Sequence, residues 1–198
     1  MKTQNMVRVW DPLVRSFHWI LVIAFFTAYF TEDDFLTPHV YAGYTVLGLI
    51  GFRLIWGVIG GRYARFTSFV TRPKVAWQYL KDTLAFRAKR YLGHNPAGGA
   101  MIVLLLISLL LTTLTGLAAY GASETAGPLA GWLGNIGETG EDMIKEVHEF
   151  FANFTVFLVV IHVAGVIFES LVHRENLVRA MFSGDKKTEQ TRAADQEG

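Results

Sequence analysis

Residues 101–111 read MIVLLLISLLL and contain no charged side chain and a single hydroxyl group. A helix of this composition is apolar on every face, unlike a helix on the surface of a soluble protein. The apolar stretch around it extends over residues 97–120, and crossing the hydrocarbon core of a bilayer takes around 20 helical residues. The sequence therefore predicts a transmembrane helix here.

Three further stretches are apolar over a similar length, at residues 14–30, 40–59 and 150–172. The first contains His18, the second Arg53, and the last His162 and Glu169. Ionisable side chains at such depth are energetically costly, which makes them candidates for function. We expect an all-α fold, an integral membrane four-helix bundle.

Composition agrees with this fold class. The chain has 198 residues, of which 52% are hydrophobic and 18% are charged, and its formal net charge is +1. These values exclude a disordered chain and give no basis for a nucleic-acid partner, so we expect none. Membrane lipid is the expected surrounding.

The charges are segregated along the chain. Basic residues gather in residues 1–17, 61–94 and 172–198, whereas the two intervening loops are acidic and hold only Lys145 among the lysines and arginines. By the positive-inside rule both termini and the middle loop are cytoplasmic, as an even number of spans requires. The polar N-terminus has no signal-peptide pattern. We expect a multi-pass protein of the bacterial inner membrane.

The segments outside the spans have distinct compositions. Residues 73–91 predict an amphipathic helix on the cytoplasmic surface between the second and third spans, with Trp77 and Leu84 on its apolar face. Residues 121–145 contain six glycines, so we expect an irregular extracytoplasmic loop. Residues 1–184 are the predicted membrane domain, and residues 185–198 are a polar tail that we expect to be disordered.

Four of the six histidines lie in the spans or at their ends: His18, His39, His148 and His162. Fourteen residues separate His148 from His162. At about 100° per residue this step falls about 40° short of four turns, so both lie on one helix face, about 21 Å apart along the axis. By depth, His148 matches His39 on the extracytoplasmic side and His162 matches His18 on the cytoplasmic side. The sequence predicts two pairs at two depths.

Two neutral imidazoles that face each other across a four-helix bundle are typical axial ligands of a b-type haem. The chain has no cysteine, which excludes thiolate sites and covalent c-type attachment. We therefore expect two non-covalent b haems. A lone intramembrane histidine is more often a hydrogen-bonding or proton-relay group, which leaves a non-haem metal or proton carrier as an alternative.

Two arginines are candidates for binding haem propionates, because a guanidinium matches a carboxylate through two hydrogen bonds. They are Arg15, before His18, and Arg53 in the second span. For Arg53 the rival role is to extend towards the lipid headgroups. Asn95 precedes Pro96 at the start of the third span, and we expect it to cap that helix.

Several segments resemble a known family. They are RSFHW (15–19), HVYAGYTVLGLIGFRLIWG (39–57), GHNPAGG (93–99), HEFFAN (148–153) and HVAGVIFESLVHRENLVRAMFSG (162–184). Together they resemble, over nearly the whole chain, the four-helix membrane cytochromes b that include bacterial cytochrome b-561 and the b-type subunit of nickel hydrogenases. The resemblance implies that His18 and His162 bind the iron of the cytoplasmic-side haem, and that His39 and His148 bind the iron of the periplasmic-side haem.

The resemblance also implies a function. Quinone would be the electron partner in the membrane, and a c-type cytochrome or a dehydrogenase such as hydrogenase the partner in the periplasm. We expect a diheme cytochrome b that carries electrons across the membrane between them, whether or not it is a quinone oxidoreductase in its own right. The alternative from the same family is a superoxide oxidase that reduces quinone. That activity calls for a positive extracytoplasmic funnel, whereas the extracytoplasmic loops are acidic.

Overall fold

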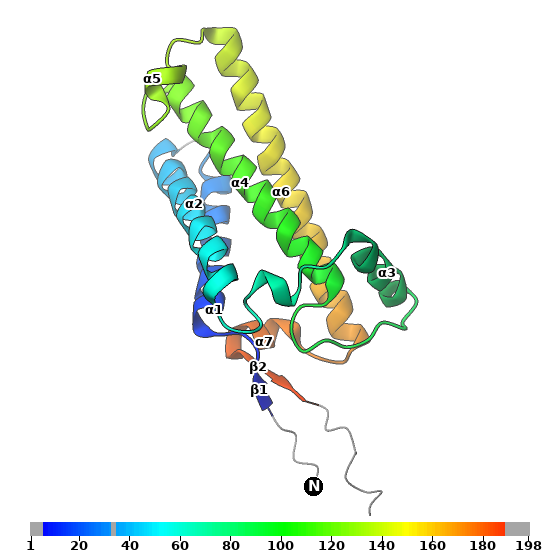
Figure 1. Cartoon of the computed structure of the whole chain (residues 1–198). Coiled ribbons are helices and arrows are strands. Elements are labelled where there is room, and N and C mark those ends of the chain that lie inside the picture. The colour runs from blue at the N-terminus through cyan, green and yellow to red at the C-terminus, as the bar shows by residue number, and fades with distance from the viewer. Residues whose placement is uncertain (1–5, 33–34, 189–198) are drawn as a thin grey trace, which may run out of the picture.

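The apolar run at residues 101–111 lies inside α4 (Pro96–Ser123) of the computed structural model, which describes residues 6–32 and 35–188. Three other long helices complete a bundle, namely α1 (Pro12–Phe30), α2 (Leu36–Ile59) and α6 (Glu138–Val172) (Figure 1). All four are long and apolar enough to cross a membrane. The prediction of four spans in an all-α bundle is confirmed.

Capping side chains fix where two of these helices begin. Asp11 Oδ1 accepts a hydrogen bond from the backbone N–H of Val14 at 2.9 Å, at the start of α1. Asn95 Oδ1 accepts one from the N–H of Gly98 at 2.7 Å, at the start of α4. In both cases a proline follows the cap, where its missing N–H costs nothing. The predicted capping role of Asn95 is confirmed.

The long helices expose apolar side chains on their outer faces. Ile23, Phe30, Val58 and Val160 are each more than half exposed. Such an outer surface suits lipid rather than water, because large apolar side chains cover it and the helical backbone satisfies its own hydrogen bonds along the span. The apolar interior is a small cluster that joins α1, α2 and α4, made of Ala24, Phe25, Val46, Ile50 and Leu109.

The four helices do not pack equally. α4 packs along α6, α1 packs on α2, and α2 packs on α4, whereas α6 makes no comparable contact with α1 or α2 in the described part of the chain. The α4–α6 contact includes a buried hydroxyl cluster at its middle, in which Thr155 Oγ1 lies 2.7 Å from Ser108 Oγ and 3.1 Å from Thr112 Oγ1. α6 reaches the α1–α2 pair through side chains, since Val156 and Val159 pack against the core cluster and Asn153 Oδ1 accepts from Tyr29 at 3.3 Å.

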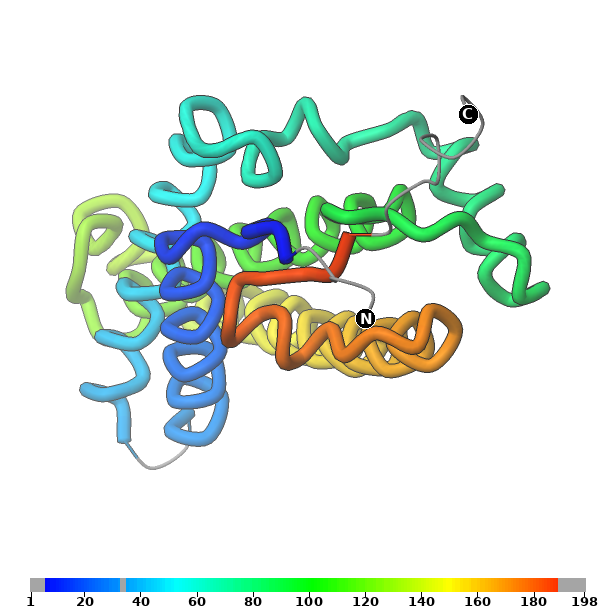
Figure 2. The backbone as a smooth tube through the Cα atoms, turned by 90° about the horizontal axis from the view of Figure 1, so that it is seen from below, coloured from blue at the N-terminus to red at the C-terminus, as the bar shows by residue number. Residues whose placement is uncertain are grey.

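The two ends of the bundle differ in construction. At one end β1 (Met6–Arg8) pairs antiparallel with β2 (Asp185–Lys187), and α7 (Leu177–Ser183) lies beside them. Figure 2 shows these first and last described segments crossing the end of the bundle next to each other. We call this the β-ribbon end. At the opposite end, the α5 end, the short helix α5 (Ala130–Leu133) follows α4 in the chain and packs on it.

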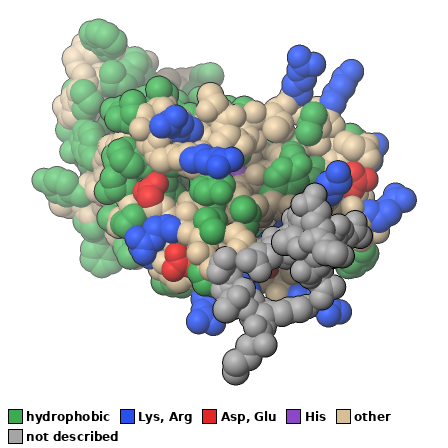
Figure 3. All heavy atoms as spheres, turned by 60° about the horizontal axis from the view of Figure 1, so that its bottom comes forward, with side chains coloured by type: hydrophobic (Ala, Val, Ile, Leu, Met, Phe, Trp, Pro, Cys, Tyr) green, Lys and Arg blue, Asp and Glu red, His purple; other side chains and the backbone are tan. Residues whose placement is uncertain are grey.

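The β-ribbon end also carries the connection from α2 to α4. It consists of η1 (Phe66–Ser68), α3 (Pro73–Leu84) and the loops around them. Many Lys and Arg side chains gather on this end of the molecule, while the sides of the bundle are hydrophobic (Figure 3). α3 buries Ala76, Tyr79 and Thr83 against the protein and leaves Trp77 59% exposed. Its exposed apolar face is the one that the sequence pattern indicated.

Three boundaries differ from expectation. α6 begins at Glu138, so the expected irregular loop is shorter, because only Gly140 interrupts an otherwise favourable helical sequence after Gly137. α3 ends at Leu84. Phe86 has a positive φ of 56°, which is incompatible with a right-handed helix, so the helix cannot continue through this residue. Residues 185–187, which the composition assigned to the polar tail, form β2. Residues 189–198 of that tail lie outside the described residues.

Candidate cofactor sites

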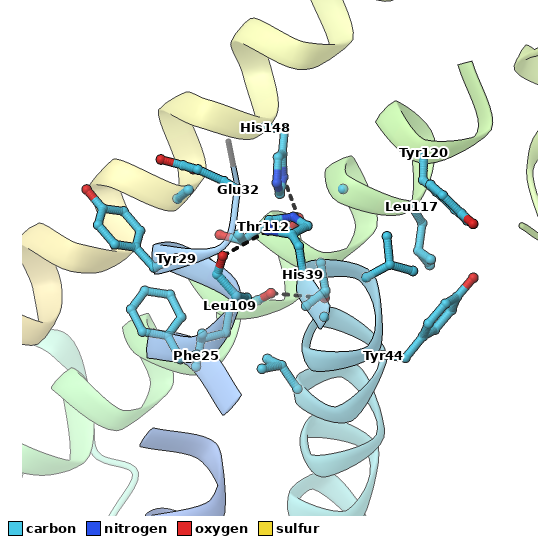
Figure 4. Close-up of a pocket in the computed structure, with 17 residues that line it drawn as sticks. Phe25, Tyr29, Glu32, His39, Tyr44, Leu109, Thr112, Leu117, Tyr120 and His148 are labelled. Atoms are coloured by element: carbon cyan, nitrogen blue, oxygen red, sulfur yellow. Dashed lines mark hydrogen bonds between the residues drawn. The ribbon is translucent and has the colours of Figure 1, made fainter. Parts of the chain in front are cut away.

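The first histidine pair lies at the α5 end. His39 stands near the start of α2, and His148 stands in the first third of α6. Their ring centroids are 6.0 Å apart, and the ring planes cross at 87°. Figure 4 shows both imidazoles in one pocket, although they come from helices that make little direct contact. The pairing that depth predicted is present.

Backbone carbonyls orient both rings. His39 Nδ1 lies 2.8 Å from the carbonyl oxygen of Ala28, and His148 Nδ1 lies 3.0 Å from that of Thr112. Because a carbonyl only accepts, each Nδ1 must carry the proton and donate it. Each Nε2 is then unprotonated, and an unprotonated imidazole nitrogen can ligate a metal. The hydrogen bond from Nδ1 to the carbonyl also fixes the orientation of the ring.

The spacing of the rings suits one metal atom between them. Metal–imidazole bonds are about 2.0–2.1 Å long, and two such bonds plus the radii of two imidazole rings span about 6 Å. The close approach of His148 to α4 requires a glycine, because a Cβ on Gly116 would lie 2.9 Å from His148 Cε1. Any larger residue at that position would displace the ring.

Around this pair is a cavity that is partly open to the outside and lined by residues of α1, α2, α4 and α6. Phe25 and Tyr29 lie on one side of the cavity, and Leu117, Tyr44 and Tyr120 lie on the other (Figure 4). The walls are mostly apolar, as a porphyrin requires, so the lining and the two imidazole donors suit a b-type haem.

The second pair, His18 on α1 and His162 on α6, lies at the β-ribbon end. His18 and His162 are close enough to interact electrostatically, but among the described residues their rings do not form a contact like the one between His39 and His148. His18 packs edge-on against Trp19, with centroids 4.9 Å apart, and its buried Nδ1 has no hydrogen-bond partner among the described residues. An unbonded buried imidazole nitrogen is costly and suits a site completed by a ligand.

Arg53 does not extend to the surface. Its side chain is among the most buried polar groups, with the residue 3% exposed. Nη2 donates to the carbonyl of Ala64 at 3.0 Å, and the guanidinium lies 4.8 Å from the centre of the Phe66 ring. Nη1 is buried without a partner among the described residues. The alternative in which Arg53 extends to the headgroups is therefore wrong.

Arg15 lies at the same end, on the first turn of α1. Its Nη1 donates to the carbonyl of Phe182 in α7, and its buried Nε has no partner in the described part of the chain. Gly184, which has a φ of +89°, allows this approach, because a Cβ there would lie 3.3 Å from Arg15 Nε and 2.7 Å from the carbonyl oxygen of Trp10. Both arginines thus keep a donor available inside the β-ribbon end.

His94 is partly buried, in surroundings that the sequence pattern did not indicate. Its ring lies between Trp10 and Phe69, at centroid distances of 4.4 and 4.7 Å, and its Nδ1 has no partner among the described residues. Burial, followed by the charges of Arg53 and Lys186 and by His162, lowers the pKa of His94 to about 3. The ring is therefore neutral at physiological pH. In the sequence, the neighbouring Asn95 indicates only the start of a helix. No local pattern around His94 indicates its contact with Trp10.

Two glutamates at the β-ribbon end, Glu175 and Glu169, each contact more than one partner. Glu175 accepts from Arg90 at 2.9 Å and lies 3.6 Å from the buried Lys186 Nζ. Glu169 lies 3.1 Å from His173 Nε2 and accepts from Thr83 at 3.3 Å. Within residues 6–32 and 35–188, no group of three or more His, Asp or Glu side chains is arranged to hold a metal ion.

Comparison with known proteins agrees with this arrangement. The family model of prokaryotic cytochrome b561 matches residues 9–184. A probable Ni/Fe-hydrogenase B-type cytochrome subunit of Azotobacter vinelandii is 26% identical over 93% of this chain and 90% of its own length. Proteins with the same name from Azotobacter chroococcum and Cupriavidus necator are 28% and 27% identical, over 93% and 89% of this chain and 90% and 85% of their own lengths. No solved structure matches significantly.

Family and fold together make this a multi-pass protein of the bacterial inner membrane. The match extends over both histidine pairs and all four long helices. The chain belongs to the prokaryotic cytochrome b561 family of membrane cytochromes, which carry b-type haem and transfer electrons.

Proposed function

We propose that the chain binds two b haems and carries electrons across the membrane between quinone and a redox partner on the other side. His39 and His148 would ligate the haem iron at the α5 end, and His18 and His162 the iron at the β-ribbon end. The observation that carries the proposal is the His39–His148 pair, with both Nδ1 atoms bound to carbonyls and a 6.0 Å separation of the rings.

The remaining roles follow from what each residue offers. Bound haem supplies the one-electron chemistry, while the protein supplies axial nitrogens, an apolar cavity and nearby charges. Arg15 and Arg53, each with a buried unbonded nitrogen, would bind the propionates of the haem at the β-ribbon end. The carbonyls of Ala28 and Thr112 keep the imidazoles of the α5 end in the ligating tautomer.

The charge distribution supports one orientation in the membrane. Lysines and arginines gather at the β-ribbon end (Figure 3), which carries both described chain ends. We place this end, with α3 lying on the membrane surface, in the cytoplasm. The α5 end is then periplasmic, and α6, whose 35 residues span about 52 Å, extends beyond a hydrocarbon core of about 30 Å.

The names of the relatives support a partner. Several are described as B-type cytochrome subunits of Ni/Fe hydrogenases. A periplasmic hydrogenase, or another dehydrogenase or c-type cytochrome, would exchange electrons with the haem at the α5 end. Quinone would be the partner within the membrane. The superoxide-oxidase alternative finds less support, because Glu32 is the only charged residue, histidines aside, among the described residues that line the α5-end cavity.

The test is the loss of one haem at a time. We expect His148→Ala to abolish the haem of the α5 end and His18→Ala that of the β-ribbon end, so that each purified variant retains half of the low-spin b-type absorbance in a reduced-minus-oxidised spectrum. His173→Ala is the matched control, since His173 caps the end of α6 beside Glu169, and it should retain both haems. Full absorbance in either ligand variant would contradict the assignment.

A further inference from the structure

α3 leaves an apolar stripe uncovered. One face of this helix is buried against the rest of the protein. A second face carries Trp77, Leu80 and Leu84, each of which is more than a third exposed. Their spacing of three and four residues places them in one line along the helix. A surface helix in water turns such a stripe towards a core. Here the described residues leave it exposed, so it is available to something outside the chain.

The stripe adjoins the apolar outer surface of the spans. Phe86, just beyond α3, is 71% exposed, and its ring centroid lies 5.6 Å from that of Phe168 near the end of α6. Leu171, within one turn of Phe168, is also exposed. Figure 1 shows α3 at the side of the bundle, next to the lower ends of α4 and α6. The stripe therefore continues the lipid-facing surface at the level where the spans end.

Cations surround this stripe. Residues 72–89 hold five lysines and arginines, all of them exposed, namely Arg72, Lys74, Lys81, Arg87 and Lys89. None of the five forms an ion pair in the part of the chain that the structure describes. Asp82 is the one acidic residue of the segment, and it accepts from Gln78 at 3.1 Å. The segment thus presents five positive charges against one negative charge.

The lysines of α3 border the stripe. Lys74 and Lys81 are seven residues apart, so they fall about 20° short of two full turns and stand about 10 Å apart along one edge of the helix. Trp77 lies between them in the chain, and its ring centre is 5.4 Å from Lys81 Nζ. Tryptophan and lysine side chains both place an apolar body in the acyl region and a polar tip at the headgroups. This edge of α3 therefore matches a lipid headgroup layer.

Charge determines which lipid fits this segment. A zwitterionic headgroup has no net charge to set against the cations, whereas an anionic phospholipid has a phosphate with no cation of its own. Each Lys or Arg close to an anionic membrane surface strengthens attachment by about fivefold. We propose that residues 72–89 bind anionic phospholipids. Lys74 and Lys81 contact the phosphates, and the stripe inserts between the acyl chains. This inference rests on the proposed placement of α3 at the membrane surface and requires no haem.

The lipid would act on the bundle through the contacts of the α3 segment. Thr83 Oγ1 donates to Glu169 at 3.3 Å, and Arg90 donates to Glu175, just after α6, at 2.9 Å. These bonds join the α3 segment to the end of α6. Because a ligand that binds only the folded protein raises its unfolding temperature, anionic lipid should stabilise the connection between α2 and α4.

The experiment is fluorescence quenching of the purified holoprotein in phosphatidylcholine vesicles. One preparation contains a small fraction of phosphatidylglycerol with brominated acyl chains, and another contains the same fraction of brominated phosphatidylcholine. Bromine quenches tryptophan on contact, and the signal lost in Trp77→Phe isolates Trp77. We expect the brominated anionic lipid to quench Trp77 more strongly, and this preference to fall at high salt, which screens the charges.

Two outcomes would overturn the inference. Equal quenching of Trp77 by the two brominated lipids would mean that the segment contacts lipid without selecting its charge, while the placement of α3 on the membrane would stand. Absence of quenching by either lipid would refute that placement as well and would leave the stripe to a protein partner. Neither outcome bears on the number of haems bound, which absorbance measures separately.

Charge variants identify the residues responsible. Lys74→Gln combined with Lys81→Gln should lower the preference for the anionic lipid by about fivefold for each lysine. Lys74→Arg combined with Lys81→Arg retains both charges and should keep the preference. Arg62→Gln is the control, because Arg62 is exposed at the same end and lies outside the segment, and it should leave the preference unchanged. An unchanged preference in the double Gln variant, or a loss in Arg62→Gln as large as in Lys81→Gln alone, would overturn the inference.

Discussion

The two ends of the bundle hold their histidine pairs with different kinds of segment. At the α5 end, helices and their own carbonyls are sufficient, since Ala28 and Thr112 orient His39 and His148 around a cavity. At the β-ribbon end, segments from both ends of the chain close the bundle: Trp10 packs against His94, the Phe182 carbonyl accepts from Arg15, and β1 pairs with β2. The site at the α5 end depends on helices alone, whereas the site at the β-ribbon end depends also on contacts between segments far apart in the sequence.

This difference has consequences for stability and for redox properties. The α5-end site depends on the close approach of helices, so it is sensitive to residue size within the bundle. The β-ribbon-end site depends on loops and terminal segments, which open more readily than the centres of helices. This end also contains the buried Arg53 and the partly buried Arg15. Variants that affect one end alone separate the two kinds of site.

The largest effect is expected at Gly116. A Cβ there would lie 2.9 Å from His148 Cε1, so Gly116→Val should displace the ligand and abolish the haem of the α5 end while the other is retained. Haem content per chain measures this as a fall by half. Gly131→Val is the control, since nothing lies within 4 Å of a Cβ at Gly131. Full haem content in the Gly116 variant would mean that His148 is not needed to bind haem.

The β-ribbon end should respond to Gly184. Its φ of +89° and its 2.7 Å Cβ distance to the Trp10 carbonyl oxygen make Gly184→Val strained, at a cost of about 1–3 kcal/mol. We expect a lower unfolding temperature and partial loss of the β-ribbon-end haem, seen in spectra of the variant against wild type. Loss of the α5-end haem instead would mean that the two ends are not independent.

A smaller effect is expected from removing the cap of α4. Asn95→Ala eliminates the hydrogen bond to the Gly98 N–H, which costs about 1 kcal/mol. The start of α4 lies at the β-ribbon end, so thermal release of haem should begin there. Asn95→Ser retains a capping oxygen and should behave as wild type. If the temperature of haem release fell equally in Asn95→Ala and Asn95→Ser, the side chain would have a role other than capping.

The smallest effect is expected midway between the sites. Thr155→Val removes the hydroxyl that joins Ser108 and Thr112, and hydrogen bonds between membrane helices contribute about 0.6 kcal/mol on average. Both haems should be retained with unchanged spectra, and unfolding by a denaturing detergent should occur slightly earlier. A spectral change at either haem would show that the centre of the bundle couples the two sites.

The sequence predicted what depends on helical repetition. The four spans follow from hydropathy, and the His39–His148 pair follows from depth and the fourteen-residue step, because helix geometry is regular. The Asn95 cap is a local signal that requires no tertiary information.

Other features depend on contacts between distant segments. The sequence left the role of Arg53 open, since its burial depends on the loop that brings Ala64 and Phe66 over it. His94 gave no signal of its position between Trp10 and Phe69, and the β1–β2 pairing joins residues far apart in the chain. The early start of α6 was missed because glycine content alone underestimated the helical preference after Gly137.

The most direct test of a two-site cytochrome is its haem stoichiometry. A pyridine haemochrome assay with protein quantitation on the detergent-purified wild-type chain should give two b haems per chain, with low-spin bands in the reduced-minus-oxidised spectrum. A single haem per chain would mean that one of the histidine pairs, at the α5 end or at the β-ribbon end, has no haem, and none would contradict the assignment of both.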